Sequence, residues 1–347
     1  MTIIDAYTHF FPKPYLSKLE ALPSEKARSI AARWIERIRN RPHYAELESR
    51  LTDLDKYRID YEVIAITQDV DPNRIGPLGA ELELSITRLL NDEMARVMKE
   101  SKKRIYSLAS VPFASISNDA GGKEEGEEGI EEMRRSVQQL GLKGFFVLSN
   151  INGTPIDKYN SFWREAERLN VPVYIHPIDP ISNTSRPYED DFDLMHVFGW
   201  PFETTLILSR LAFSGVLETH PRLRILAHHM GGMIPFFAGR INESYGKTTG
   251  LVKRDQKIGG LQEGKPAMDL FKQFYYDTAV GGSSEAIRCG LDIFGVDRIV
   301  FGTDYPFGPE AGKVRLATYP SRVLDLGLST EENKKIFEEN ARRLLGN

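Results

Sequence analysis

Eight short apolar runs, widely spaced along 347 residues, constrain the fold of this chain more than any other feature. Several are nearly continuous stretches of β-branched or aromatic residues, which is typical of parallel strands buried on both faces. We expect strands at Ile3–Ala6, Tyr61–Thr67, Ile105–Val111, Leu142–Leu148, Val171–His176, Leu223–His228, Phe274–Val280 and Arg298–Gly302. Strands that alternate with helices form parallel βαβ units, so eight of them favour a closed barrel.

Helical periodicity fills the spaces between these runs. It is clearest over Leu82–Lys99, Gly129–Leu140, Tyr159–Leu169, Glu203–Thr219, Ser283–Phe294 and Thr330–Leu345. The sequence therefore predicts an α/β fold, a (β/α)8 TIM barrel formed by a single domain over residues 1–347, with an open eight-stranded sheet as the alternative. Residues 12–43 are rich in Arg and Pro and predict a small insertion after the first strand. Residues 178–201 predict a long loop beside the site.

The composition is that of a globular protein with an ample core, since 41% of residues are hydrophobic and the net charge is −4. Lys and Arg are scattered among acidic residues, which argues against a nucleic-acid partner. We find no apolar stretch of membrane-spanning length and no secretory signal. The single cysteine, Cys289, excludes an internal disulfide and predicts a cytoplasmic location.

Polar side chains at strand ends mark the candidate site, because chemistry in such barrels takes place at the C-terminal ends of the strands. Four of the seven histidines (His9, His176, His228 and His229) lie there, together with Asp304. Imidazole and carboxylate groups are the ligands that hold Zn(II), Mn(II) or Fe(II). Three such ligands with an open position make a catalytic site, whereas structural zinc is usually closed by four ligands that include Cys.

The other three histidines carry weaker expectations. His43 lies in the insertion and His220 at a helix end, so we interpret both as structural or surface residues. His196 follows the fifth strand, where a substrate contact and a surface position are equally compatible with the sequence.

Five motifs occur in order along nearly the whole chain. They are Arg50–Asp60 (RLTDLDKYRID), Gly199–Thr205 (GWPFETT), His229–Phe236 (HMGGMIPF), Gly302–Phe307 (GTDYPF) and Asn340–Leu345 (NARRLL). Together with the residues at the strand ends, they make the chain resemble the amidohydrolase superfamily. The resemblance is greatest to the branch that contains aminocarboxymuconate semialdehyde, resorcylate and carboxyvanillate decarboxylases.

The resemblance implies that His9, His176 and Asp304 bind a divalent metal, with zinc as the first choice and manganese or iron as alternatives. The family usually begins with His-x-His, or Glu-x-His in some aromatic-acid decarboxylases, whereas Tyr7 stands at the first position here. A phenol must lose a proton of high pKa to bind a metal well. We therefore expect Tyr7 to donate a hydrogen bond or to fill the barrel mouth, with weak ligation as the alternative.

The catalytic histidine of the family precedes a glycine-rich turn and an Arg in a Gly-Arg-Ile context. The position of Arg240 relative to that turn identifies this histidine as His229. Along a strand, side chains alternate, so His228 is expected to point into the layer between barrel and helices. We therefore predict that His229 and Asp304 are catalytic and that His228 is a packing residue.

The resemblance implies a non-oxidative decarboxylase, a carboxy-lyase that acts on a small aromatic or unsaturated carboxylic acid. In such a site the metal holds the substrate, His229 polarises it or orients water, and Asp304 moves the proton. A hydrolase of a lactone, ester or C–C bond at the same site is the alternative. A metal-free barrel with a binding role is the second alternative.

A carboxylate substrate requires a cation, and Arg240 is the first candidate. In the resembled decarboxylase the matching Arg reaches the site of a neighbouring subunit, which implies a homodimer or a dimer-based oligomer. An interface salt bridge is the alternative role for Arg240. The insertion offers three further candidates, Arg37, Arg39 and Arg41. Aromatic residues near the strand ends are expected to wall the substrate: Tyr7, Phe10, Phe11, Trp200, Phe202, Tyr305 and Phe307.

Overall fold

A computed structural model describes residues 1–22, 25–74, 79–116, 126–178, 191–245, 258–261 and 265–346. Its strands are β1 (Ile4–His9), β2 (Tyr61–Ala65), β3 (Ile105–Ser107), β4 (Phe145–Leu148), β5 (Asn150–Ile151), β6 (Thr154–Pro155), β7 (Val173–His176), β8 (Ile225–Ala227), β9 (Tyr275–Asp277) and β10 (Ile299–Val300). All eight predicted strands are present. The hairpin of β5 and β6 was not predicted from the sequence.

The eight parallel strands form two sheets that close into one ring. One sheet has the order β1-β2-β3 and the other β10-β9-β8-β7-β4. Two parallel bridges join them, Ala109 to Phe145 and Thr8 to Tyr305. At the second junction the backbone N–H of His9 donates to the carbonyl of Tyr305 at 2.7 Å. The predicted (β/α)8 barrel is therefore confirmed.

Helices surround this ring. They are α1 (Lys13–Glu20), α2 (Glu25–Arg39), α3 (Leu47–Tyr57), α4 (Ala80–Glu100), α5 (Glu127–Gln138), α6 (Asn160–Leu169), α7 (Trp200–Phe213), α8 (Val216–Thr219), α9 (Ala238–Tyr245), α10 (Met268–Phe271), α11 (Ser284–Phe294), α12 (Lys313–Leu324), α13 (Thr330–Lys334) and α14 (Asn340–Leu345). The predicted helix over Glu203–Thr219 is interrupted at Gly215, whose φ of +85° suits glycine. A π-helical segment joins α13 to α14.

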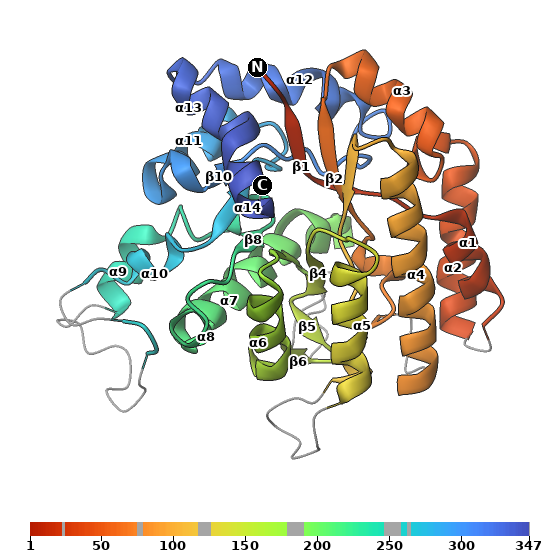
Figure 1. The fold of residues 1–347 in the computed structure, drawn as a ribbon. Helices are drawn as coiled ribbons and strands as arrows, with labels where there is room; N and C mark the ends of the chain where they lie inside the picture. The colour runs from red at the N-terminus through yellow and green to blue at the C-terminus, as the bar shows by residue number, and fades with distance from the viewer. Residues whose placement is uncertain are drawn as a thin grey trace.

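The predicted insertion is helical and packs against the loop that carries Asp304. Helices α1 and α2 lie side by side at the edge of the barrel (Figure 1). The ring of Trp34 on α2 stacks on Phe11 with centroids 4.3 Å apart. The hydroxyl of Tyr44, just after α2, donates to the carbonyl of Pro306 at 2.7 Å. These contacts place α2 beside the C-terminal ends of the strands.

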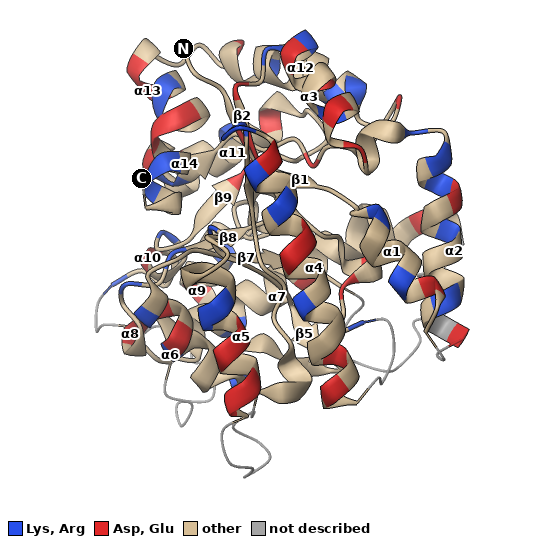
Figure 2. Cartoon of the chain, turned by 45° about the vertical axis from the view of Figure 1, so that its right-hand side comes forward, with Lys and Arg blue, Asp and Glu red and all other residues tan. Residues whose placement is uncertain are grey.

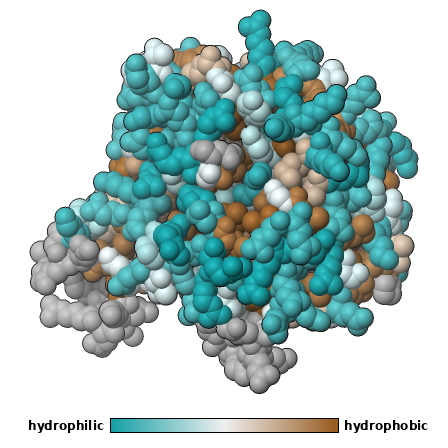
Figure 3. All heavy atoms as spheres, in the orientation of Figure 1, coloured by the Kyte–Doolittle hydropathy of each residue, from teal (hydrophilic) through white to brown (hydrophobic). Residues whose placement is uncertain are grey.

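Charged residues of both signs are interspersed along the helices shown in Figure 2, and most of the face shown in Figure 3 is hydrophilic. The core also contains charged residues that pair with each other. Arg50 on α3 and Glu62 on β2 are both fully buried and form a bidentate ion pair, with Nε to Oε1 at 2.8 Å and Nη2 to Oε2 at 2.8 Å. The described helices include none that is long and apolar enough to cross a membrane.

Candidate metal centre

The barrel brings three imidazole groups and one carboxylate together at the ends of its strands. His9 ends β1, His176 ends β7, His228 follows β8 and Asp304 follows β10. Oδ1 of Asp304 lies 3.3 Å from Nε2 of His9 and 3.6 Å from Nε2 of His228. One nitrogen from each of the three histidines lies within 4.8 Å of the other two. The predicted ligands His9, His176 and Asp304 therefore converge.

Hydrogen bonds at Nδ1 fix the orientation of the imidazole rings. Nδ1 of His9 contacts the carbonyl of Ile66 at 3.0 Å, and Nδ1 of His176 contacts the carbonyl of Pro177 at 2.6 Å. A carbonyl accepts only, so both Nδ1 atoms carry the proton and donate it. Each Nε2 then has a free lone pair directed away from that bond. This is how metal-binding histidines are usually held.

His228 is held in the same way by a carboxylate. Its Nδ1 lies 2.5 Å from Oδ2 of Asp277 on β9. Among the described residues, Nε2 of His9 and Nε2 of His228 are buried without a hydrogen-bond partner. Buried polar atoms are rarely left unpaired, because each costs about 1–3 kcal/mol. A divalent cation between Nε2 of His9 and Asp304 would give that nitrogen a partner.

The ionisation of Asp304 and His176 also suits a cation. Burial by itself raises the pKa of Asp304, but the adjacent imidazoles of His228 and His9 and the charge of Arg315 hold it well below its usual range. Burial and the charge on His228 lower the pKa of His176 well below 6.5. Burial also lowers the pKa of His228, yet Asp277 and Asp304 outweigh this effect and raise it to about 9.

Left-handed backbone occurs at two of the same strand ends. Asp304 has a φ of +61°, His229 of +54° and Met230 of +53°. Left-handed backbone in residues other than glycine costs on the order of 1 kcal/mol or more and clusters at functional sites. The turn after β8 tolerates it because the backbone N–H of His229 donates to Oδ1 of Asp277 at 3.0 Å.

The prediction that His228 packs outside the site is wrong. The alternation argument assumed a strand as far as residue 228, but β8 ends at Ala227 and the chain turns at His229. The rings of His228 and His229 consequently lie on the same side, with centroids 3.7 Å apart. Both line the pocket. Burial and the neighbouring charge of His228 lower the pKa of His229 well below 6.5.

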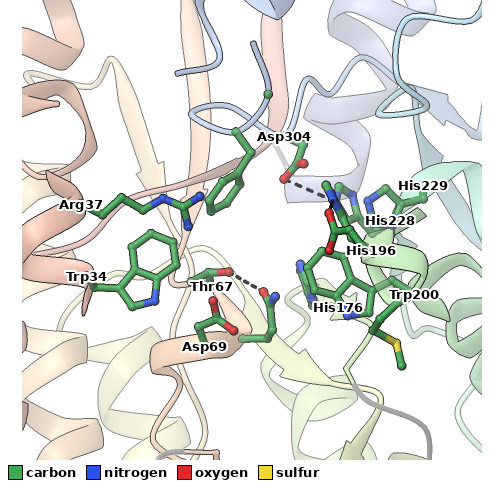
Figure 4. Close-up of a pocket in the computed structure, with 15 residues that line it drawn as sticks. Trp34, Arg37, Thr67, Asp69, His176, His196, Trp200, His228, His229 and Asp304 are labelled. Carbon is green, nitrogen blue, oxygen red and sulfur yellow. Dashed lines mark hydrogen bonds and ion pairs between the residues drawn. The ribbon is translucent and has the colours of Figure 1, made fainter. Parts of the chain in front are cut away.

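The pocket has a volume of about 310 Å³ and extends from the histidines to helix α2 (Figure 4). Its wall on α2 is formed by Trp34 and Arg37, and Phe307 lies between these residues and His9. The remaining lining residues are Thr67, Gln68, Asp69, His176, Asp193, Met195, His196, Trp200, His228, His229, Asp304 and Gly308. Residues 179–190 of the predicted loop over 178–201 lie outside the described residues. The described part of that loop contributes Asp193, Met195, His196 and Trp200 to the pocket wall.

The other residues predicted for the site occupy different places. Trp200 lines the pocket, with its ring 6.2 Å from that of His176. Tyr7 is buried behind His228 and does not belong to the described lining, nor does Phe202. Arg240 is exposed on α9, away from that lining. His43 and His220 are buried outside the described lining as well.

Several residues close to the site were missed from the sequence, among them Trp34, Asp277 and Arg315. Asp277 holds His228, and Arg315 on α12 lies 2.7 Å from Oδ2 of Asp304. The position of Asp277 at the end of a predicted strand was an available signal, since every strand end in a barrel is a candidate. No motif or spacing marked Arg315, because it lies in the first turn of helix α12 and reaches the strand end only through the tertiary fold.

Comparison with known proteins agrees with this geometry. A family model described as Amidohydrolase matches residues 4–346. A 2-amino-3-carboxymuconate-6-semialdehyde decarboxylase of Dictyostelium discoideum is 27% identical over 299 residues, which cover 86% of this chain and 76% of that protein. A gamma-resorcylate decarboxylase of Rhizobium sp. (strain MTP-10005) is 29% identical over 287 residues, 76% of this chain and 80% of that protein.

The solved structures show the same fold. A dihydroxybenzoic acid decarboxylase from Polaromonas sp. JS666, with bound manganese and the inhibitor 2-nitroresorcinol, has a TM-score of 0.75 to this chain at 21% identity. The match covers 99% of this chain and 97% of that one. These matches confirm the resemblance that the strand-end motifs predicted, including its decarboxylase branch.

Proposed function

Because the chain belongs to the amidohydrolase family, we propose that it is a metal-dependent, non-oxidative decarboxylase of a small aromatic or unsaturated carboxylic acid. The observation that carries this proposal is the convergence of His9, His176 and Asp304. The Nδ1 atoms of both histidines donate to backbone carbonyls, which leaves the lone pairs of their Nε2 atoms for a metal. These residues would hold a divalent ion. Zinc suits their nitrogen and oxygen atoms, and manganese is the alternative, as in the solved neighbour.

Bound there, a divalent ion would hold oxygen atoms of the substrate and stabilise the negative charge that develops on them. His229 lines the pocket, and its Nδ1 has no hydrogen-bond partner among the described residues. We assign to His229 the relay of a proton from water to the carbon that carries the carboxyl group, because its neutral imidazole can accept a proton at one nitrogen and release one from the other. As that carbon gains the proton, its bond to the carboxyl carbon breaks and carbon dioxide leaves. His228, oriented by Asp277, would place positive charge beside Asp304.

The pocket volume suits a substrate with a single ring. The ring of Phe307 lies 5.3 Å from that of His9 and 6.0 Å from that of Trp34, measured between centroids. A substrate ring packed on Phe307 would therefore have one end at the histidines and the other at α2. There, Trp34 presents a buried indole N–H without a partner in the described chain, and Arg37 presents a guanidinium group. These donors would bind an oxygen substituent.

A second copy of the chain would bring Arg240 to the site. Arg240 is exposed, and Phe236 and Phe237 just before it are 79% and 39% exposed. Exposed aromatic residues beside an arginine are typical of protein interfaces. We therefore propose a homodimer in which Arg240 serves the partner's pocket. Mixing inactive R240A with inactive H176A tests this arrangement, because one site of a mixed dimer would be intact and activity would return.

Metal content and carbon dioxide release test the proposed function. We expect purified protein to contain a stoichiometric divalent metal, to lose activity on prolonged chelation and to recover it when Zn or Mn is added back. His176→Ala should abolish both metal and activity, whereas substitution of the exposed His196 by Ala should leave the metal bound. Protein that holds no metal and gains no activity from added metal would overturn the proposal.

The reaction class is tested on a panel of substrates. We expect carbon dioxide release from hydroxybenzoates or from muconate semialdehydes, and no turnover of lactones and esters. Turnover of esters without release of carbon dioxide would assign a hydrolase to this site instead.

A further inference from the structure

The two oxygen atoms of the Asp304 carboxylate have different surroundings. Oδ1 faces His9 and His228, whereas Oδ2 accepts a hydrogen bond from Nη1 of Arg315 at 2.7 Å. The same Nη1 donates to the backbone carbonyl of Thr303 at 3.1 Å. One guanidinium group thus holds both the carboxylate and the backbone that carries it.

Arg315 reaches Asp304 from the first turn of α12, and the chain makes room for it. The side chain is only 15% exposed, and its Nε is buried without a hydrogen-bond partner among the described residues. Gly308, with a φ of +99°, lies against this nitrogen. A Cβ atom at position 308 would come within 2.4 Å of it, so no other residue fits while Arg315 keeps this position.

We propose that Arg315 is a positioning residue for the metal centre: it occupies Oδ2 of Asp304, so that the carboxylate presents Oδ1 alone to a bound ion. This inference rests on the proposed function, since it requires Asp304 to be a ligand. Carboxylates bind metals through one oxygen or through both, and partners outside the ligand set decide the geometry. Arginine suits this task because its guanidinium carries several N–H donors, and here Nη1 alone bonds two acceptors at once.

The consequence is an open coordination position. A carboxylate that binds the ion through both oxygens would occupy a coordination position that the substrate needs. With Oδ2 held by Arg315, that place stays free for an oxygen of the substrate. The same contact fixes the direction of Oδ1, which lies within 3.6 Å of two imidazole nitrogens.

Two variants remove this contact in different ways, and each has a matched control. Arg315→Met removes the guanidinium, and Arg322→Met removes an exposed arginine from the same helix. Gly308→Ala keeps Arg315 but places a methyl group against its Nε. Gly295→Ala imposes comparable backbone strain, at a φ of +84°, where nothing lies within 4 Å of the added atom.

We expect R315M and G308A to bind Zn or Mn about 10–100-fold more weakly than the wild type in titrations of the metal-free protein. The visible absorption of the cobalt-substituted protein should also change, because it reports the number of ligand atoms. R322M and G295A should match the wild type in both measurements. Urea denaturation identifies any variant that is merely unfolded, and either of the two variants suffices if the other does not fold.

Wild-type affinity and an unchanged cobalt spectrum in the folded variants would overturn the role of Arg315 while leaving the proposed function intact. A wild-type protein that binds no metal would overturn both.

Discussion

The imidazole of His228 lies flat against the phenol ring of Tyr7, with centroids 4.0 Å apart and planes 10° apart. Tyr7 stands where relatives are expected to carry a first metal ligand, yet its ring supports another histidine of the site. Its hydroxyl is buried and has no hydrogen-bond partner among the described residues. Burial and the charge of Asp277 raise the pKa of this phenol well above 10, which opposes ligation.

Tyr7→Phe should therefore leave the metal content nearly intact, because the substitution keeps the ring that stacks on His228. The free energy of unfolding should change little or rise, since an unpaired buried hydroxyl is lost. Elemental analysis of the purified variants measures the metal. His176→Ala serves as the comparison, and equal metal loss from both variants would show that Tyr7 is a ligand.

Asp277→Asn tests the tautomer of His228. Oδ1 of Asp277 accepts from the backbone N–H groups of His229 and Ala279, both at 3.0 Å, which leaves Oδ2 for His228. In the variant, Asn keeps its oxygen on those N–H groups and turns its NH₂ toward His228. Nδ1 of His228 must then accept, so the ring loses the positive charge that Asp277 stabilises and keeps a proton on Nε2 alone.

We expect this change to lower activity about 10–100-fold, the range typical for partners that orient residues of a metal site. Asp269→Asn on α10 removes an exposed carboxylate and should have no effect. If D277N kept wild-type activity, the Asp277–His228 contact would be purely structural.

Arg37→Ala should raise KM about tenfold or more, because a hydrogen bond between charged groups contributes roughly 1.5–3 kcal/mol. We expect kcat to change less, since the pocket wall at α2 binds the substrate and its transition state alike. Steady-state kinetics measure both constants. Arg39→Ala, an exposed arginine at the end of the same helix, is the control. An equal rise of KM in both variants would point to general electrostatic attraction instead.

Asp5 predicts a pH dependence of stability. Burial raises the pKa of this carboxyl to about 7, against the hydrogen bonds from Thr303 that lower it. The folded state therefore binds the proton more tightly than the unfolded chain does. The stabilisation of the folded state by this tighter proton binding is complete below about pH 4 and is lost as the pH rises through about 7.

Asp5→Asn mimics the protonated form and should flatten the decline in the free energy of unfolding between pH 5 and 8, by at most about 1.4 kcal/mol per pH unit. Urea denaturation at several pH values measures this slope. The exposed Asp325→Asn should leave it unchanged. An unaltered slope in D5N would contradict the shifted pKa.

The sequence was sufficient for the barrel because buried strands have a signature that depends on local residues alone. All eight strands appeared where their apolar runs predicted them, and His9, His176 and Asp304 followed as strand-end residues. His228 was misplaced because alternation holds only while a strand continues, and left-handed backbone at His229 reverses it. Arg315 was missed because a contact between a helix and a strand end has no local pattern.

The closure of the ring through Thr8 and Tyr305 has a consequence for biosynthesis. His9 leaves the ribosome before Asp304, so the two sides of the site meet only after all the residues between them have been made. Until then β1 lacks its neighbour on the side of β10, and this exposed strand edge is open to mispairing. The metal centre can therefore form only after the barrel has been synthesised as far as Asp304.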